Sequence, residues 1–147
     1  MAAAVYKRLD HLIPLVMPGL PLHSRHDVFV FREDGSRLRL LVHLPRSKGP
    51  CPLVLWMHGG GFSLGMPEMV YGSAGSVFLK DCIVVCPDYS LDPFPRGLED
   101  GYTGLRWLKS RAAVLGGNPD QIFVGGESAG GNLAAAFARL NYFRKQS

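Results

Sequence analysis

The chain has 147 residues, of which 47% are hydrophobic and 19% are charged, and its formal net charge is +4. This composition is that of a globular domain with a core of its own, and it excludes a disordered chain. Lysine and arginine are scattered, and the densest cluster, residues 32–39, is interrupted by Glu33 and Asp34. Because no basic stripe alternates with aromatic residues, we expect no nucleic-acid partner and a solvated charged surface instead.

The N-terminal residues and the cysteines indicate the cellular compartment in which the protein is expected. Residues 1–9 carry no apolar run with a basic flank and a small-residue cleavage site, so we expect no signal peptide. The apolar residues 12–22 are few and are interrupted by prolines, so we expect no transmembrane segment. The cysteines lack the spacing of a disulfide framework, which favours reduced thiols and a cytoplasmic protein.

Two regions precede the first long apolar run. Residues 1–27 are predicted to form an N-terminal arm, with a short helix at residues 2–15 and extended chain where the prolines follow. Residues 28–31 are predicted to form a strand, and the turn-forming residues 33–36 to lead into a second strand. That second strand contains Leu38, Leu40 and Val42 at alternate positions, so one of its faces should be buried.

Three later segments are continuous apolar runs, the pattern typical of strands buried on both faces of a parallel sheet. These runs are residues 53–57, 83–86 and 122–124. Helical patterns lie between and after them, so buried strands alternate with helices. This order predicts an α/β fold with a mostly parallel sheet and helices on both of its faces.

The intervening segments are predicted from spacing and composition. Residues 71–79 are predicted to form a short helix. A stronger helical pattern comes from four residues at helical spacing, Leu98, Tyr102, Leu105 and Leu108. Residues 118–120 read Asn-Pro-Asp and predict a turn, and the alanine-rich residues 132–144 predict a final helix.

One motif that bears chemistry is Gly126-Glu127-Ser128-Ala129-Gly130, between the last apolar run and the final helix. A serine on a tight strand-to-helix turn needs small neighbours, because the backbone there is crowded. The helix directs free N–H groups and the positive end of its dipole toward the serine oxygen, which favours developing negative charge. The simpler alternative is a glycine-rich helix entrance with Ser128 as a cap.

The other motif, His58-Gly59-Gly60-Gly61-Phe62, directly follows the first apolar run. Glycines lack a Cβ, so their N–H groups can approach a ligand oxygen closely. A tetrahedral intermediate of acyl transfer needs two or three such donors about 3 Å from its oxyanion. Alone, the motif is better explained by a flexible loop. Both motifs follow strands of the predicted sheet, so they should meet at its carboxyl edge, where open α/β sheets bind ligands.

Together the two motifs resemble those of the hormone-sensitive-lipase branch of α/β-hydrolases, a family of serine esterases. Further segments are similar to the family's usual sequence, at residues 87–91, 94–100, 106–108 and 115–120. The resemblance covers about residues 28–140. One departure follows Tyr89, where the family usually has Arg-Leu-Ala-Pro-Glu and this chain has Ser-Leu-Asp-Pro.

The resemblance implies a carboxylic ester hydrolase that works through a serine acyl-enzyme on a small acyl ester. Ser128 would be the nucleophile, and the N–H groups of Gly60, Gly61 and Ala129 would form the oxyanion hole. The resemblance implies no cofactor and no metal ion.

Four residues are expected to support the motifs without reacting, namely His58, Gly59, Gly126 and Gly130. His58 would orient the loop and would not be the catalytic base, because it precedes the glycines. The remaining histidines, at positions 11, 23, 26 and 43, all come before the glycine loop. We expect them to be surface or strand residues.

In these folds the catalytic triad runs in chain order serine, acid, histidine. After Ser128 the sequence contains no aspartate, glutamate or histidine, and Glu127 should point away from its neighbour. We therefore expect residues 28–147 to be a partial α/β-hydrolase domain, truncated after the nucleophile helix and nearly inactive alone. Such a chain would be a fragment, a gene-model truncation or a short isoform.

This truncation would leave the strand at residues 122–124 as an exposed sheet edge, through which the chain could self-associate. The alternatives to an ester hydrolase are therefore a regulatory fragment and a non-catalytic protein that binds a small ligand in the same pocket. An intact glycine loop and an intact Ser128 favour the enzyme.

Overall fold

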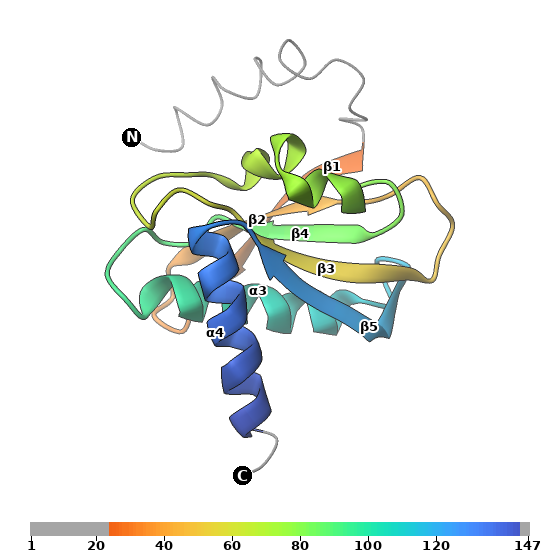
Figure 1. The fold of residues 1–147 in the computed structure, drawn as a ribbon. Helices are drawn as coiled ribbons and strands as arrows, with labels where there is room; N and C mark the ends of the chain where they lie inside the picture. Colours follow the sequence, from red (N-terminus) through yellow and green to blue (C-terminus); the bar gives the residue numbers. More distant parts are fainter. Residues whose placement is uncertain (1–23, 145–147) are drawn as a thin grey trace.

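The computed structural model describes residues 24–144 and the side chains up to residue 140 (Figure 1). The helix predicted at residues 2–15 and most of the arm predicted at residues 1–27 lie outside the described residues. The first strand begins at Arg25, three residues before the start predicted at Val28. The first strand extends beyond its apolar residues because residues 25–27 also pair with the second strand.

A five-stranded mixed sheet forms the centre of the described chain. Its strands are β1 (Arg25–Phe31), β2 (Arg37–His43), β3 (Cys51–Met57), β4 (Ile83–Pro87) and β5 (Gly117–Gly126). They lie in the order β1-β2-β4-β3-β5, with β3 parallel to both β4 and β5. The hairpin β1–β2 adds to this parallel part as an antiparallel edge. The predicted α/β fold is confirmed, and the two motifs follow the parallel strands β3 and β5.

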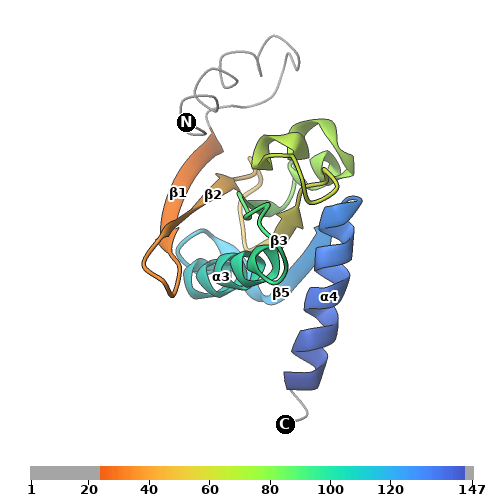
Figure 2. The same ribbon diagram turned by 90° about the vertical axis from the view of Figure 1, so that its left-hand side faces the viewer.

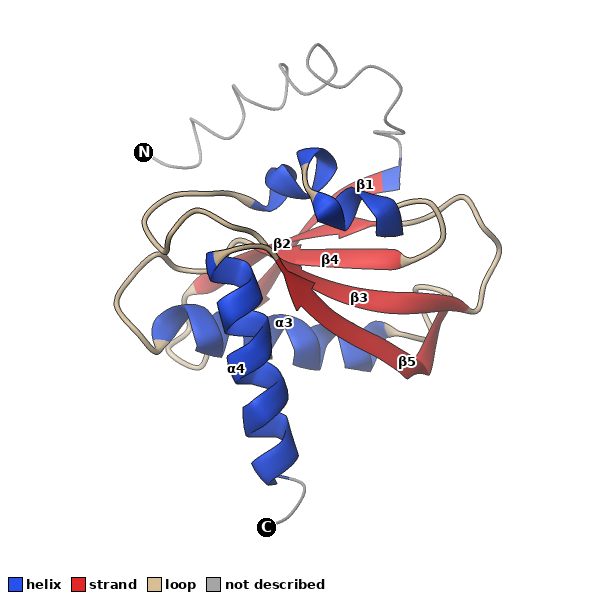
Figure 3. Cartoon of the chain, in the orientation of Figure 1, coloured by secondary structure: helices blue, strands red, loops and turns tan. Residues whose placement is uncertain are grey.

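Helices cover the two faces of the sheet (Figures 1 and 3). The α-helices α3 (Arg96–Arg111) and α4 (Ala129–Arg144) lie on one face, and the 3-10 helices η2 (Pro67–Gly72) and η3 (Ala74–Phe78) lie on the other. Figure 2 shows α3 and α4 side by side when the view is turned.

The alternation of strand side chains between two hydrophobic clusters fixes this arrangement. In β3, Leu53, Leu55 and Met57 belong to the cluster under α3 and α4. Val54 and Trp56 belong to the cluster under the 3-10 helices. Because β3 lies inside the sheet, between β4 and β5, and is buried on both faces, its apolar run is continuous, as expected for a parallel strand.

The single short helix predicted at residues 71–79 is wrong. The chain forms η2 and η3 instead, separated at Ser73. Ser73 has an extended backbone (φ −110°, ψ 178°), and its hydroxyl accepts a hydrogen bond from the Gly75 N–H at 3.1 Å. Serine and glycine favour caps and turns over helix interiors, which explains the break.

The β5 strand is longer than its apolar run because it begins at Gly117. Its pairing with β3 is irregular, since Cys51 pairs with Gly117 whereas Leu53 pairs with Ile122. Within this irregular stretch the Asn118 side chain accepts a hydrogen bond from the Asp120 N–H at 3.0 Å. The turn predicted at residues 118–120 is therefore present as a local Asx-type hydrogen bond inside a distorted strand.

Among the described strands, β5 lies at an edge of the sheet, as predicted. The Phe123 side chain on this strand is 57% exposed. A search of the described residues finds no helix with both the length and the apolar character that a bilayer crossing requires.

Candidate active site

Ser128 lies between the end of β5 and the first residue of α4, in a left-handed backbone conformation with φ +52°. Such a conformation costs an L-residue roughly 1–2 kcal/mol, so the surrounding structure must hold it. The carbonyl oxygen of Ser128 accepts from the Asn132 N–H at 3.0 Å, which starts the helix directly after the turn. The residue is exposed, so its hydroxyl is presented to solvent at the carboxyl end of the strand.

The glycines on either side of this turn allow the backbone to cross the end of β3. A Cβ on Gly130 would overlap the carbonyl oxygens of Met57 and His58, and a Cβ on Gly126 would overlap the backbone of Gly130. These approaches are possible only without a side chain. The crowding that the sequence pattern predicts is present in the structure.

The glycine loop after β3 packs directly against the serine turn. An ideal Cβ on Gly59 would lie 3.6 Å from the Ser128 Cβ, which is ordinary van der Waals contact. Gly60 and Gly61 then have φ values of +126° and +62°. The two motifs therefore adjoin at the carboxyl ends of neighbouring strands, with the backbone of the loop beside the serine.

A tight turn closes the same loop. The N–H groups of Ser63 and Leu64 both donate to the Gly60 carbonyl oxygen at 3.1 Å. Phe62 is held at φ +61° and its side chain is 46% exposed. The Gly60 carbonyl oxygen accepts both hydrogen bonds, so they fix the orientation of the peptide groups between Gly60 and Leu64.

His58 is buried behind this loop, with only 1% of its surface exposed. Its Nδ1 lies 2.7 Å from the Gly59 carbonyl oxygen, so Nδ1 must carry the proton of this hydrogen bond. Burial lowers the pKa of His58 below its usual value of 6.5, so the ring is neutral at pH 7. A neutral, enclosed ring fits the loop-orienting role inferred from the sequence.

Tyr89 fixes His58 from the segment that follows the neighbouring strand β4. The two rings stack with centroids 4.1 Å apart, and the Tyr89 hydroxyl donates to the His58 carbonyl oxygen at 2.7 Å. Burial raises the pKa of Tyr89 to about 12, so the hydroxyl keeps the proton that it donates. The sequence did not predict this contact. The only signal was a tyrosine two residues after the buried strand β4.

A buried ion-pair network anchors the segment that follows the loop. Arg39 on β2 contacts both carboxylate oxygens of Glu68 on η2, at 2.7 and 3.0 Å, and Arg25 contacts the same carboxylate at 2.7 Å. Arg39 also contacts Asp88 at 3.3 Å. These hydrogen bonds to Glu68 raise the pKa of Arg39 despite its burial, which on its own would lower it. The network therefore binds η2 to the sheet.

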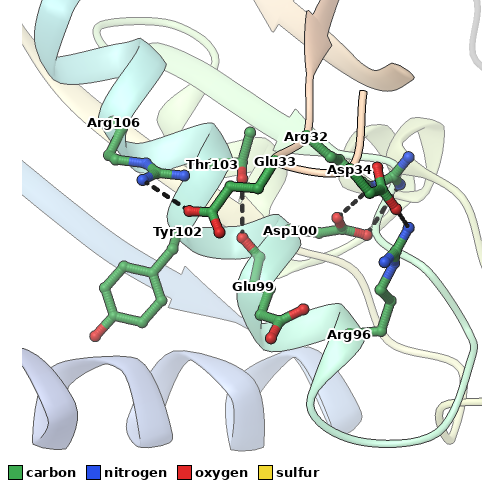
Figure 4. Close-up of a pocket in the computed structure, with 9 residues that line it drawn as sticks. All are labelled: Arg32, Glu33, Asp34, Arg96, Glu99, Asp100, Tyr102, Thr103 and Arg106. Atoms are coloured by element: carbon green, nitrogen blue, oxygen red, sulfur yellow. Dashed lines mark hydrogen bonds and ion pairs between the residues drawn. The ribbon is translucent and has the colours of Figure 1, made fainter. Parts of the chain in front are cut away.

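A polar cavity of about 430 Å³ opens elsewhere, between the β1–β2 turn and helix α3 (Figure 4). Neither Ser128 nor a glycine of the loop lines it. Inside it, Arg32 pairs with Asp100 at 2.6 Å, and Arg96 pairs with Asp34 at 2.6 Å. The candidate active site is therefore located by the motifs and not by this cavity.

No acid–base pair accompanies the serine in the part of the chain that the structure describes. Residues 24–140 contain no side-chain hydrogen bond between Ser128 and a histidine or carboxylate. His43 is buried on β2 with its Nε2 3.0 Å from the Leu79 carbonyl oxygen, and His26 lies on β1. The same residues hold no cluster of histidine, cysteine or carboxylate side chains that could bind a metal ion.

Comparison with known proteins finds relatives described as α/β-hydrolases and carboxylesterases. A family model described as the α/β-hydrolase fold matches residues 54–146. The chain is 38% identical over 137 residues to an AB hydrolase superfamily protein of Schizosaccharomyces pombe, covering 84% of this chain and 40% of that protein. It is 43% identical over 93 residues to the carboxylesterase NlhH of Mycobacterium tuberculosis, covering 60% of this chain and 29% of that protein.

A solved structure agrees with these relatives. The chain matches EstE1, a thermostable carboxylesterase cloned from a metagenomic library, with a TM-score of 0.78 and 33% identity. The match covers 99% of this chain and 51% of EstE1. The chain thus spans about half of that structure, and less than half of the curated relatives above.

Proposed function

The chain belongs to the α/β-hydrolase fold family, and from this premise we propose that it carries the nucleophile and the oxyanion hole of a carboxylic ester hydrolase. The observation that supports the proposal is the close approach of the glycine loop to the serine turn, where even a Cβ added at Gly59 would reach van der Waals distance of the Ser128 Cβ, and Ser128 has a left-handed backbone. The carboxylesterase relatives support the reaction class and the hormone-sensitive-lipase type.

In the proposed reaction the Ser128 Oγ attacks the ester carbonyl carbon and forms a tetrahedral intermediate. The N–H groups of Gly60, Gly61 and Ala129 donate to its oxyanion. The intermediate then expels the alcohol and leaves an acyl-enzyme, which water hydrolyses to the free acid and the serine. His58 supports the loop through its backbone carbonyl and its buried ring.

The attack also requires a base that takes the serine proton. His58 is enclosed, and no residue after Ser128 in this sequence is an aspartate, a glutamate or a histidine. In α/β-hydrolases these two triad members follow the serine in the chain. We therefore propose that the 147-residue chain is nearly inactive by itself, and that an active enzyme needs an acid and a histidine supplied by further sequence.

Ester hydrolysis tests both parts of this proposal. The chain is assayed with p-nitrophenyl esters of short and medium acids, as is a longer chain that carries an acid and a histidine after Ser128, each beside a Ser128→Ala variant. We expect the 147-residue chain to show almost no turnover above its Ser128→Ala variant. A kcat above about 1 s⁻¹ that Ser128→Ala abolishes would show that this chain is active alone.

The exposed edge of β5 supports a second function, a regulatory fragment that pairs with another copy. Phe123 on this strand is 57% exposed, and unpaired edges of apolar strands favour strand pairing. Size-exclusion chromatography tests this function, because a stable monodisperse monomer at micromolar concentration would contradict it.

The thiols support a reducing compartment, which we propose to be the cytoplasm. Cys51, Cys82 and Cys86 are all free. Burial raises the pKa of Cys82 and, more strongly, of Cys86, which makes these thiols poor candidates for oxidation. Thiol titration under denaturing conditions, on protein purified without reductant, should find three reduced cysteines.

A further inference from the structure

The segment after β4 is held on both sides of Tyr89. On one side, the Asp88 N–H donates to the Arg39 carbonyl oxygen at 2.9 Å, and the Asp88 carboxylate contacts the Arg39 guanidinium. On the other side, the Ser90 N–H donates to Asp100 Oδ2 at 2.7 Å. Tyr89 therefore lies between two backbone hydrogen bonds, one to the sheet and one to helix α3.

The anchor on the Ser90 side is a buried ion pair. Asp100 is 1% exposed, and Arg32 binds both of its oxygens, at 2.6 and 3.1 Å. Arg32 also lies within 3.3 Å of the Ser90 hydroxyl. A buried carboxylate is costly unless it is paired and hydrogen-bonded, and here it has an arginine and a backbone N–H. The carboxylate consequently has little freedom to move.

These contacts continue to the glycine loop. The Tyr89 hydroxyl donates to the His58 carbonyl oxygen, and the next residue is Gly59, whose backbone lies close to the serine turn. One hydrogen-bonded path from Asp100 to Gly59 runs through Ser90, Tyr89 and His58. A displacement of Ser90 would therefore move the hydroxyl that fixes the first peptide group of the loop.

We propose that the Arg32–Asp100 ion pair positions the oxyanion loop through Ser90 and Tyr89. This inference rests on the proposed function, because only that function makes the glycine loop an oxyanion hole. The effect of the ion pair on the loop's conformation does not itself require catalysis. Arg32 and Asp100 would be positioning residues, since neither contacts Ser128 or the reacting atoms.

The same cavity provides a matched control. Asp34 and Arg96 form a second ion pair there, with side chains 46% and 34% exposed (Figure 4). The hydrogen bonds of Asp34 go to Ser36 and Arg96 and not to the segment around Tyr89. Asp34→Asn therefore makes the same chemical change as Asp100→Asn in a residue that lines the same cavity, without a hydrogen bond to Ser90.

Amide hydrogen exchange of the 147-residue chain tests the coupling directly. The Ser63 and Leu64 amides report opening of the loop, because both are bonded to the Gly60 carbonyl oxygen. The Leu55 amide in β3 reports opening of the sheet. We expect Asp100→Asn to speed exchange at Ser63 and Leu64 by about fivefold or more relative to Leu55, and Asp34→Asn to leave the ratio unchanged.

A double-mutant cycle separates positioning from general destabilisation. If Asp100 acts through the Tyr89 hydroxyl, Asp100→Asn should add almost nothing in a Tyr89→Phe background. Arg32→Gln breaks the same pair from its more exposed partner and is measured in the same way, should Asp100→Asn not fold. Additive effects in the cycle, or equal acceleration at Leu55 and in the loop, would overturn the proposal.

The exchange experiment and the esterase assay can fail separately. Loop exchange that depends on Asp100 and Tyr89 in the 147-residue chain would support the positioning role, and a longer chain that carries an acid and a histidine after Ser128 but lacks Ser128-dependent esterase activity would separately remove the proposed function. Esterase activity that depends on Ser128, together with additive exchange effects in the double-mutant cycle, would support the proposed function and overturn the positioning role.

Discussion

The Tyr89 hydroxyl lies 2.7 Å from the His58 carbonyl oxygen, and through this hydrogen bond the segment after β4 holds the loop after β3. Strands β4 and β3 are neighbours in the sheet, so the segments at their carboxyl ends meet. The His58 ring stacks on the Tyr89 ring, and its Nδ1–H donates to the Gly59 carbonyl oxygen. The glycine loop is thereby fixed by side chains behind it, while its backbone faces the serine turn.

Gly130→Ala should damage the serine turn. The new methyl group would overlap the carbonyl oxygens of Met57 and His58, which belong to the backbone and cannot rotate away. We expect a loss of about 1–3 kcal/mol in the free energy of unfolding, measured by urea denaturation. Gly131→Ala is the control, because its nearest neighbour would be the Gly126 carbonyl oxygen at 3.2 Å. Equal losses for the two variants would contradict the account.

Stability should fall in mild acid because of His58. Burial lowers its pKa below 6.5 in the folded chain, so below pH 6.5 the unfolded chain binds more protons than the folded chain. The free energy of unfolding then decreases as the pH falls, by up to about 1.4 kcal/mol per pH unit until the folded pKa is reached.

The measurement compares urea denaturation of the chain and of His58→Gln between pH 7.5 and pH 5. Asp88 lies near His58, and burial raises the pKa of its carboxyl. Protonation of Asp88 therefore raises the free energy of unfolding as the pH falls, opposite to the effect of His58. The comparison with His58→Gln separates the two effects. His58→Gln should lose this pH dependence, whereas His26→Gln on β1 should retain it. Parallel curves for the chain and His58→Gln would refute the assignment.

Glu68→Gln should destabilise the chain strongly. The substitution leaves the buried guanidinium of Arg39 without its bidentate carboxylate, and removing one member of a buried pair costs about 3–5 kcal/mol. Glu33→Gln is the control, because its side chain is 87% exposed and its contact with Arg106 is 3.5 Å. That control should change the free energy of unfolding by less than about 0.5 kcal/mol.

Phe123→Lys should reduce any self-association of the chain. A lysine on the exposed edge strand β5 places a charge where another strand would pair. Phe31→Lys on β1, the opposite edge, provides the control, since Phe31 is 72% exposed. Sedimentation velocity should show fewer oligomers for the first variant only. Unchanged oligomers in Phe123→Lys would remove β5 as the contact surface.

The sequence predicted the features that depend on local pattern. The continuous apolar run of β3 identified a parallel strand, and the spacing of Leu98 to Leu108 identified α3. The motif around Ser128 predicted a crowded turn, which the structure contains. The start of α4 was placed three residues too late, because Ala129 and two glycines before Asn132 lack an apolar pattern.

Other features depend on contacts between distant residues and left no local signal. Glu68 and Arg39 are separated by 29 positions, and Arg32 and Asp100 by 68. A charged residue in the sequence does not reveal a buried partner, and we interpreted the residues around Arg32 as a solvated surface. Likewise, Gly65 gave no signal, although a Cβ there would overlap the His58 ring.

The proposed oxyanion hole requires the Gly60, Gly61 and Ala129 amides to converge on the oxyanion of the intermediate bound to the Ser128 Oγ. The most direct test treats a longer chain that carries an acid and a histidine after Ser128 with a fluorophosphonate, and records amide NMR spectra before and after labelling. We predict phosphonylation of Ser128 with the largest downfield shifts at these three amides. An unlabelled Ser128, or a labelled one with all three amides unmoved, would contradict the account.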